Sequence, residues 1–456
     1  MSEGGNTVGL DTPAQLAVDA LLDDPKTRII VCCGAGGVGK TTTAAALGVR
    51  AAERGRKAVV LTIDPARRLA QSMGIDSLDN TPRRVAGVAG DGELHAMMLD
   101  MKRTFDEIVE SHADGDRAQA ILANPFYQSL SAGFAGTQEY MAMEKLGQLR
   151  ARDDWDLIVV DTPPSRSALD FLDAPKRLGS FLDGKFIRVL MAPAKVGGRA
   201  GMKFLNVGMS LMTGTLSKLM GASLLKDVQT FVAAMDTMFG GFRTRADATF
   251  RLLQAPGTAF LVVAAPEPDA LREAAYFVER LAAERMPLAG LVLNRVHGSD
   301  AARLSAERAL AAAENLEEGG IVDQESGKTG LRDAAENGSP GAGEANDDDC
   351  EDDSDSDSDS DSEDDSEDGG RHENGHHGAS DVDDTSDVDE ITAGLLRLHA
   401  ERMQVIAREQ RTRDRFTLLH PEVAVVHVAA LPGDVHDLAG LRAIGEQLAA
   451  GVPAGA

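Results

Sequence analysis

Nine consecutive residues near the N-terminus, Gly34 to Thr42, read GAGGVGKTT and fit the pattern G-x-x-x-x-G-K-[ST]. An apolar, β-branched run at Ile29–Cys33 precedes them, and an alanine-rich run at Thr42–Arg54 follows. This is the strand, loop and helix context that the pattern needs. The glycines let successive backbone amides point at phosphate oxygens, and the helix adds the positive end of its dipole. The sequence therefore predicts a loop that binds phosphate groups.

The side chains at the end of this loop indicate the ligand. Lys40 is placed to reach the β- and γ-phosphates of a nucleoside triphosphate, and the hydroxyl of Thr41 is placed to ligate Mg²⁺. We therefore expect ATP and magnesium as ligands, and the alternative is a glycine-rich turn without a ligand. The expected phosphate-binding residues are Gly34, Gly36, Gly37, Val38, Gly39, Lys40, Thr41 and Thr42.

Two aspartates follow other strand-like runs. Asp64 comes after Ala58–Ile63, and Asp161 comes after Leu157–Val160. Phosphoryl transfer to water needs a positioned nucleophile, a metal ion and neutralised phosphate charge. We expect Asp64 to orient or deprotonate the attacking water and Asp161 to hold magnesium directly or through water, so that Asp64, Asp161 and Lys40 form the catalytic group. The alternative is that each aspartate only caps a turn or a helix.

Strand-like and helical runs alternate along the rest of the chain. This alternation predicts an α/β fold with a doubly wound, mainly parallel sheet. Other strand-like runs are His95–Leu99, Ala259–Ala264, Leu288–Leu293 and Val423–Val428. Helical runs are Ala14–Leu22, Lys102–His112, Thr137–Arg150, Asp269–Glu284 and Leu395–Arg415.

The acidic charge is concentrated in one segment. The formal net charge is -27, but 23 acidic residues and the single Arg371 lie within 344–390, so the remainder carries only -5. A segment this rich in Gly, Asp and Ser cannot bury enough apolar surface to offset its ordering entropy, and we predict that 314–390 is disordered. The ATPase domain is then predicted to comprise 1–313 and 391–456. Because that part is not basic, we expect no nucleic acid partner.

Residues 181–242 have a different composition, in which methionines and lysines are mixed with glycines. We predict a helical insertion outside the sheet. Methionine side chains are flexible and polarizable, which suits recognition of varied apolar helices, so a groove for a hydrophobic client is one interpretation. Ordinary core packing or a dimer contact is the other.

Three segments together resemble the anion-transporting (arsenite-pump) ATPase family, whose eukaryotic branch delivers tail-anchored membrane proteins. Gly34–Thr42, Thr62–Ala66 and Val160–Ser165 are similar to its P-loop, switch I and switch II. The resemblance covers most of the chain outside the acidic segment. It implies a P-loop NTPase that couples ATP hydrolysis to dimer rearrangement, adenine contact by Asn294, and a nucleotide-side loop at Leu431–Asp434.

The chain departs from the family pattern at Ala35, where the family usually has a lysine that reaches the partner subunit's nucleotide. The resemblance implies a dimer, either of two copies of this chain or with a paralogous ATPase. The missing positive charge would come from the lysine of a paralogous subunit, or from another cation such as Arg67 or Arg166. Arg166 and Ser167 stand where the family usually has Gly and His. The family's C-x-x-C zinc pair is missing, so we predict no structural zinc.

Other functions remain open from the sequence. Soft arsenite favours several convergent thiolates, but Cys32 and Cys33 are adjacent on a strand and Cys350 lies in the acidic segment, which weighs against a metalloid pump. A regulatory subunit that hydrolyses ATP poorly is an alternative because of Ala35. A positioning ATPase on DNA or a membrane is disfavoured because Leu438–Ala456 is not a basic amphipathic helix. A cytoplasmic location, with peripheral membrane contact, is expected from the missing signal peptide and apolar span.

Overall fold

The computed structural model describes residues 14–64, 68–131, 137–163, 244–319 and 381–450. The predicted insertion at 181–242, most of the acidic segment, and Arg67, Arg166 and Ser167 lie outside these residues. Grouping by contacts divides the chain into one unit at 1–303 and 402–456 and a second at 304–401. The predicted domain boundaries, 313 and 391, stay predictions.

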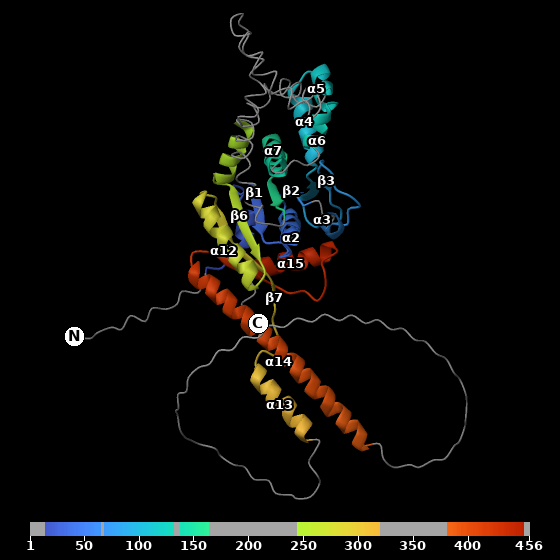
Figure 1. Cartoon of the computed structure of the whole chain (residues 1–456), viewed down its shortest axis with the longest axis vertical. Helices are drawn as coiled ribbons and strands as arrows, with labels where there is room; N and C mark the ends of the chain where they lie inside the picture. The colour runs from blue at the N-terminus through green and yellow to red at the C-terminus, as the bar shows by residue number, and fades with distance from the viewer. Residues whose placement is uncertain (1–13, 65–67, 132–136, 164–243, 320–380, 451–456) are drawn as a thin grey trace, which may run out of the picture. The chain divides into compact units, whose positions relative to one another are not determined.

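An eight-stranded sheet is the centre of the first unit (Figure 1). Its order is β3-β4-β2-β5-β1-β6-β7-β8, and all neighbours are parallel except β3 and β4. The strands are β1 (Ile29–Gly34), β2 (Lys57–Thr62), β3 (Arg83–Arg84), β4 (Glu93–Met98), β5 (Leu157–Asp161), β6 (Thr258–Ala264), β7 (Leu288–Val296) and β8 (Val425–Ala429). The predicted doubly wound, mainly parallel α/β fold is confirmed. The two-residue edge strand β3 was not predicted.

The central strands are apolar throughout because both faces of the sheet are covered. Along β1, Ile29, Val31 and Cys33 belong to one core cluster, while Ile30 and Cys32 belong to the other. Helices on the first face include α4 (Met101–His112), α7 (Thr137–Arg152) and α12 (Pro268–Ala283). Helices on the second face include α1 (Val18–Asp23), α2 (Lys40–Glu53) and α15 (Leu438–Ala450). Two independent cores therefore hold the sheet from opposite sides.

A small helical cluster adjoins the first face (Figure 1). It contains α4, α5 (Gly115–Leu122), α6 (Pro125–Ser131) and part of α7. Lys145 on α7 is only 4% exposed, and its ammonium lies 3.0 Å from a carboxylate oxygen of Glu107 on α4. The neighbouring Glu144 accepts a 2.8 Å bond from Arg245, in the helical segment 244–254. Two ion pairs, each with one buried partner on α7, thus tie this helix to the elements around it.

The structure corrects the predicted N-terminal helix. The helix was expected over 14–22, but α1 begins only at Val18. Gln15 instead forms a parallel bridge with Val425, and the Leu16 amide donates to the Val425 carbonyl at 3.1 Å. Backbone groups beside the open edge of β8 are satisfied by this pairing, which overrides local helical propensity.

The predicted bounds of the disordered segment, 314–390, were too wide. The helix α13 (Ala306–Gly319) extends past residue 314, and α14 (Asp381–Leu419) begins before residue 390. Once a helix has formed, each added residue gains one hydrogen bond, so a helix extends readily into flanking polar sequence. Residues 320–380 lie outside the residues that the structure describes. None of the helices within the described ranges is long and apolar enough to cross a membrane.

Packing of α2 on the sheet should depend on Gly48. A Cβ at this position would lie 2.5 Å from Val60 Cγ2 and 3.1 Å from Leu94 Cδ1. We expect Gly48→Leu to lower the free energy of unfolding, measured in urea, by about 1–3 kcal/mol through overpacking. Gly115→Leu is the matched control, because Gly115 is exposed and no atom lies within 4 Å of a Cβ placed there. This variant should change the free energy of unfolding by less than about 1 kcal/mol. Equal losses in both variants would contradict the packing argument.

Candidate active site

The loop between β1 and α2 depends on glycine at two positions. Gly34 has φ +150°, and a Cβ there would lie 2.0 Å from the carbonyl oxygen of Val263. Gly39 has φ +94°, immediately before α2 begins, and a Cβ there would lie 2.1 Å from the side-chain nitrogen of Asn294. A side chain at either position would push the loop away from the sheet. The predicted strand, loop and helix arrangement is present.

Asn294 holds the loop from the neighbouring part of the sheet. It lies near the end of β7, is 8% exposed, and donates from Nδ2 to the carbonyl oxygen of Val38 at 2.8 Å. The next residue, Arg295, has φ +62° and lines the cavity above the loop. In this structure Asn294 therefore positions the loop backbone. The adenine contact expected for its side chain stays a prediction.

A cavity of 530 Å³ opens over the loop. Six predicted residues line it: Gly37, Gly39, Lys40, Thr41, Thr42 and Asp64. Seven others complete the lining: Gln71, Ser72, Thr162, Arg295, Asp434, Val435 and His436. Gly34, Gly36, Val38 and Asn294, which were also expected to bind the nucleotide, are not among the lining residues. The sequence placed Asp434 in a nucleotide-side loop, and the structure places it at this cavity.

Asp161 is not itself a lining residue, but it joins two hydroxyl groups, one of them from Thr41, which lines the cavity. Its Oδ2 accepts from Thr41 Oγ1 at 2.7 Å and from Thr62 Oγ1 at 2.8 Å. Its Oδ1 is buried and has no hydrogen-bond partner. Burial is the main cause that raises the pKa of Asp161 to about 6, against the lowering effects of the two hydroxyls and Lys40. The carboxylate is therefore poised to accept a cation.

These residues fit the expected magnesium ion. Magnesium is usually held by one or two protein oxygens, with water and substrate phosphates completing its shell. Thr41 and Asp161 offer adjacent oxygens, and the unsatisfied Oδ1 gives the carboxylate a free acceptor. Among the described residues there is no group of three or more His, Cys, Asp or Glu side chains suited to a metal. A metal here would therefore need the phosphates of a bound nucleotide.

Lys40 is held against the loop itself. Its ammonium donates to the carbonyl oxygen of Ala35 at 2.7 Å, and the residue is 5% exposed. Burial lowers the pKa of Lys40, opposed most strongly by the nearby carboxylate of Asp161. A phosphate above the loop would offer this ammonium a charged acceptor in place of a neutral carbonyl, and hydrogen bonds to charged acceptors are about twice as strong.

Asp64 reaches the cavity from the end of β2. Its amide donates to Thr62 Oγ1 at 3.2 Å, the hydroxyl that also contacts Asp161. The carbonyl of the preceding Ile63 accepts from Gln138 Nε2 of α7 at 2.9 Å. The backbone at Asp64 is thus fixed on one side by the Asp161 cluster and on the other by α7.

The other lining residues lie within motif segments or close to them. Thr162 belongs to the segment Val160–Ser165 that resembles switch II, and it donates to the carbonyl of Cys32 at 2.8 Å. Arg295 comes after Asn294, and His436 lies two residues after Asp434. Adjacency to a motif was the available signal for these. Gln71 and Ser72 lie on the short helix α3 (Arg68–Ser72), which no motif indicated.

The parallel sheet, the glycine loop ending at a buried lysine, and the joined Thr41 and Asp161 define a P-loop nucleoside triphosphatase fold. A sequence model of the family described as anion-transporting ATPase matches residues 27–317. The chain therefore belongs to the anion-transporting ATPase family, whose members are ATPases.

Several curated proteins are similar over part of the chain. ATPase GET3 of Malassezia globosa is 29% identical over 172 residues, which are 38% of this chain and 50% of that protein. ATPase GET3 of Podospora anserina is 24% identical over 307 residues, 66% of this chain and 83% of that protein. ATPase BagA of Mycobacterium tuberculosis is 26% identical over 193 residues, 40% of this chain and 53% of that protein. The chain thus spans about half the length of two of these three relatives.

The buried Asp161 should cost the nucleotide-free protein stability. Between pH 3.8, its ordinary pKa, and about 6, the folded protein holds a proton that the unfolded chain has released, so stability falls as the pH rises. Above that window the cost is about 3 kcal/mol. We expect Asp161→Asn to unfold in urea with a higher free energy than the wild type at about pH 7.5, in chelator, and with a smaller difference at about pH 4.

Asp76→Asn is the matched control for this measurement, because Asp76 is exposed. It should leave the free energy of unfolding nearly unchanged at both pH values. A gain in Asp161→Asn that did not depend on pH would contradict the raised pKa.

Proposed function

We propose that this chain hydrolyses ATP with magnesium and uses the nucleotide state to handle hydrophobic or membrane-protein clients. The observation that carries the proposal is the cluster of Thr41, Thr62 and Asp161, which joins three segments at the cavity that Lys40 and Thr41 line. Residue types and distances both suit a magnesium triphosphate. The family model, which matches 27–317, supports the same activity.

The residues divide the chemistry between them. The loop amides and Lys40 bind and neutralise the triphosphate, while Thr41 and Asp161 hold the metal site. When bound, magnesium neutralises charge that develops on the phosphates. Asp64 faces the cavity from a separate strand end, where it orients the attacking water and accepts its proton. The protein thus supplies positioning and electrostatics, which is most of what phosphoryl transfer needs.

A chain of contacts supports coupling between this site and the predicted client insertion. Ile63, next to Asp64, is bonded to Gln138 at one end of α7. Farther along α7, Glu144 is 4% exposed at its side chain and pairs with Arg245 at 2.8 Å. Arg245 lies only three residues beyond the insertion predicted at 181–242. A shift at Asp64 that displaces α7 would therefore reach the edge of the insertion.

The same proposal includes a dimer of this chain, either with a second copy or with a paralogous ATPase. Ala35 is 8% exposed and its side chain belongs to the core cluster behind the loop, so this position offers no cation to a partner's nucleotide. A paralogous subunit carrying lysine there would supply the charge in one direction only. A homodimer would have to use another cation.

A regulatory or extrusion subunit is the second candidate, favoured by Ala35 and by the family description. The cysteines speak against direct arsenite binding. Burial raises the pKa of both Cys32 and Cys33, the latter to about 12, so neither is a ready thiolate ligand. Slow ATP turnover with intact nucleotide binding would favour the regulatory interpretation.

Asp64→Asn tests the catalytic assignment. We expect ATP turnover, measured as released phosphate, to fall by about 100-fold or more because the base is lost. Binding of a fluorescent ATP analogue should remain, since Lys40 and the loop are intact. Asp76→Asn, an exposed aspartate on the surface, should keep both properties. Unchanged turnover in Asp64→Asn would remove this residue from the chemistry.

Coupling to a client has its own test. We expect Met209→Gln with Met212→Gln to weaken binding of a peptide with an apolar C-terminal helix, because polar groups would replace the apolar groove. Glu144→Gln should leave peptide binding in place but reduce its dependence on added ATP, since the contact to Arg245 is weakened. Arg251→Gln, at an exposed position in the segment 244–254, is the control. Full ATP dependence in Glu144→Gln would contradict the route through α7.

A further inference from the structure

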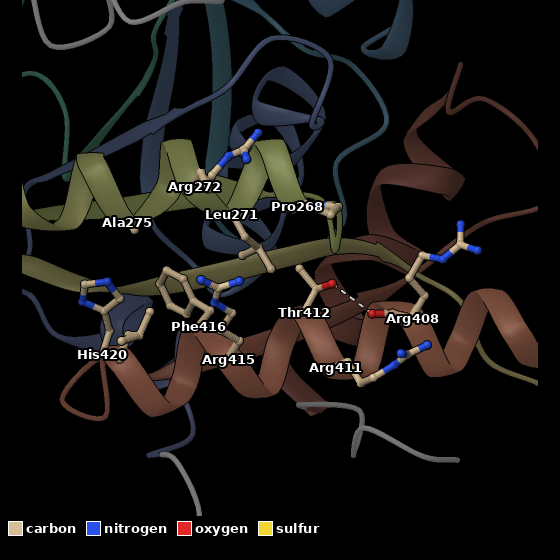
Figure 2. A pocket seen from close by; sticks show the side chains of 11 residues that line it. Pro268, Leu271, Arg272, Ala275, Arg408, Arg411, Thr412, Arg415, Phe416 and His420 are labelled. Atoms are coloured by element: carbon tan, nitrogen blue, oxygen red, sulfur yellow. Dashed lines mark hydrogen bonds between the residues drawn. The ribbon is translucent and has the colours of Figure 1, made fainter. Parts of the chain in front are cut away.

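A second cavity lies between α12 and the C-terminal part of α14, within the first unit (Figure 2). Its volume is 460 Å³, which is within the range of small-molecule sites. It shares no lining residue with the nucleotide cavity. The α14 side of the cavity lies beyond residue 317, where the match to the family model ends. Nothing in the proposed ATPase function uses this cavity.

The α14 side of the cavity carries three arginines. Arg408, Arg411 and Arg415 are spaced three and four residues apart, so they follow one another along a single helix face. All three are exposed, and among the described residues no carboxylate forms an ion pair with any of them. The only side-chain bond of Arg411 within the described part is to the carbonyl of Ala407, at 3.2 Å. Three arginines therefore line this side of the cavity without an ion pair among the described residues.

The fourth arginine comes from the opposite wall. Arg272 of α12 lines the cavity and pairs with Asp269, but both side chains are highly exposed, 75% and 84%. An exposed pair of this kind contributes little and exchanges easily with another anion. Figure 2 shows Arg415 and Thr412 extending from α14 toward α12. In the same view the guanidinium of Arg272 extends from α12 away from α14, so Arg415 is the labelled arginine that extends between the two helices.

The floor of the cavity is apolar. Leu271 and Phe416 line it and belong to the core cluster on that face of the sheet. At the end of α14, Leu419 lines the cavity while 64% exposed, and the adjacent Leu418 is 73% exposed. Apolar surface is therefore left exposed beside an apolar cavity.

We propose that this cavity binds one amphiphilic anion, with the arginines holding a phosphate head group and the apolar floor and Leu419 holding the start of an acyl chain. Guanidinium groups match phosphate oxygens in a two-bond geometry that a neutral head group cannot offer. The apolar half of the cavity adds affinity only for a ligand that has a tail. The combination selects a phosphate-bearing lipid over a free phosphate ion.

The acidic segment of the same chain is a weaker candidate for this cavity. Its charge complements the arginines, but residues 344–380 contain no Leu, Ile, Val, Phe or Met. It could pair with Arg408 and Arg415 yet would leave the apolar floor and Leu419 uncovered. An amphiphile satisfies both halves of the cavity at once.

Binding of soluble dioctanoyl phosphatidic acid to the full chain, by calorimetry without nucleotide, tests the proposal. We expect one saturable site per chain, with no detectable binding of inorganic phosphate and much weaker binding of dioctanoyl phosphatidylcholine. Arg408→Gln combined with Arg415→Gln should weaken binding about tenfold or more, since charge-assisted bonds to phosphate are lost. Ala275→Phe, which fills the apolar floor from α12, should weaken it as well. Arg251→Gln is the matched exposed-arginine control.

Other outcomes would overturn the proposal. Flotation with vesicles of equimolar phosphatidylcholine and phosphatidic acid, without binding of the soluble lipid, would mean that a membrane surface is recognised instead of a single molecule. Equal or tighter binding of a peptide with the sequence of 354–362 would assign the arginines to acidic peptides. Thermal melting and ATP turnover of each variant show that it is folded. Because the lipid measurement uses no nucleotide, it can succeed where the ATPase assignment fails, and the reverse.

Discussion

The buried carboxylate of Asp161 is the interaction on which the candidate active site depends. It joins Thr41 at the start of α2 with Thr62 at the end of β2, and it lies at the end of β5. Sheet register makes this possible, because Asp161 pairs with Cys32 of β1 on one side and with Thr62 of β2 on the other. A slip by one residue would turn its side chain to the opposite face. The position of the carboxylate therefore depends on the register of three strands that are far apart in sequence, and the two apolar cores fix that register.

Burying that charge is unfavourable, and the two hydroxyl bonds offset only part of the cost, as its raised pKa shows. The same holds for Lys40, whose pKa is lowered by burial. Two opposite charges are thus buried at one site, and Oδ1 of Asp161 has no hydrogen-bond partner there. In the proposed function, a magnesium triphosphate supplies the missing charges, and native stability is given up for function.

Most strands and the loop could be predicted from the sequence because their signals are local. A short, continuous, β-branched run such as Ile29–Cys33 is typical of a strand that is covered on both faces. The spacing of the glycines and the lysine in the loop is typical of the pattern G-x-x-x-x-G-K-[ST]. Contacts between distant segments could be predicted only where motif residues meet, as at Lys40, Asp64 and Asp161. The bond from Asn294 to Val38, the bridge from Gln15 to Val425 and the pair of Arg245 with Glu144 each join segments that carry no local sign of one another.

Ala35 shows how a single position limits the whole site. Its side chain faces the core, while its carbonyl accepts the Lys40 ammonium, so the residue supports the loop without contributing charge. Around the described cavity the remaining basic side chains are Arg295 and His436. Arg295 follows the asparagine that supports the loop from β7, whereas Asp64 and Asp161 come from strand ends on the other side of β1. In the proposed function, the end of the triphosphate near the two aspartates therefore relies on Lys40 and magnesium within this chain. Any further positive charge must come from a partner subunit or from residues beyond the described ranges.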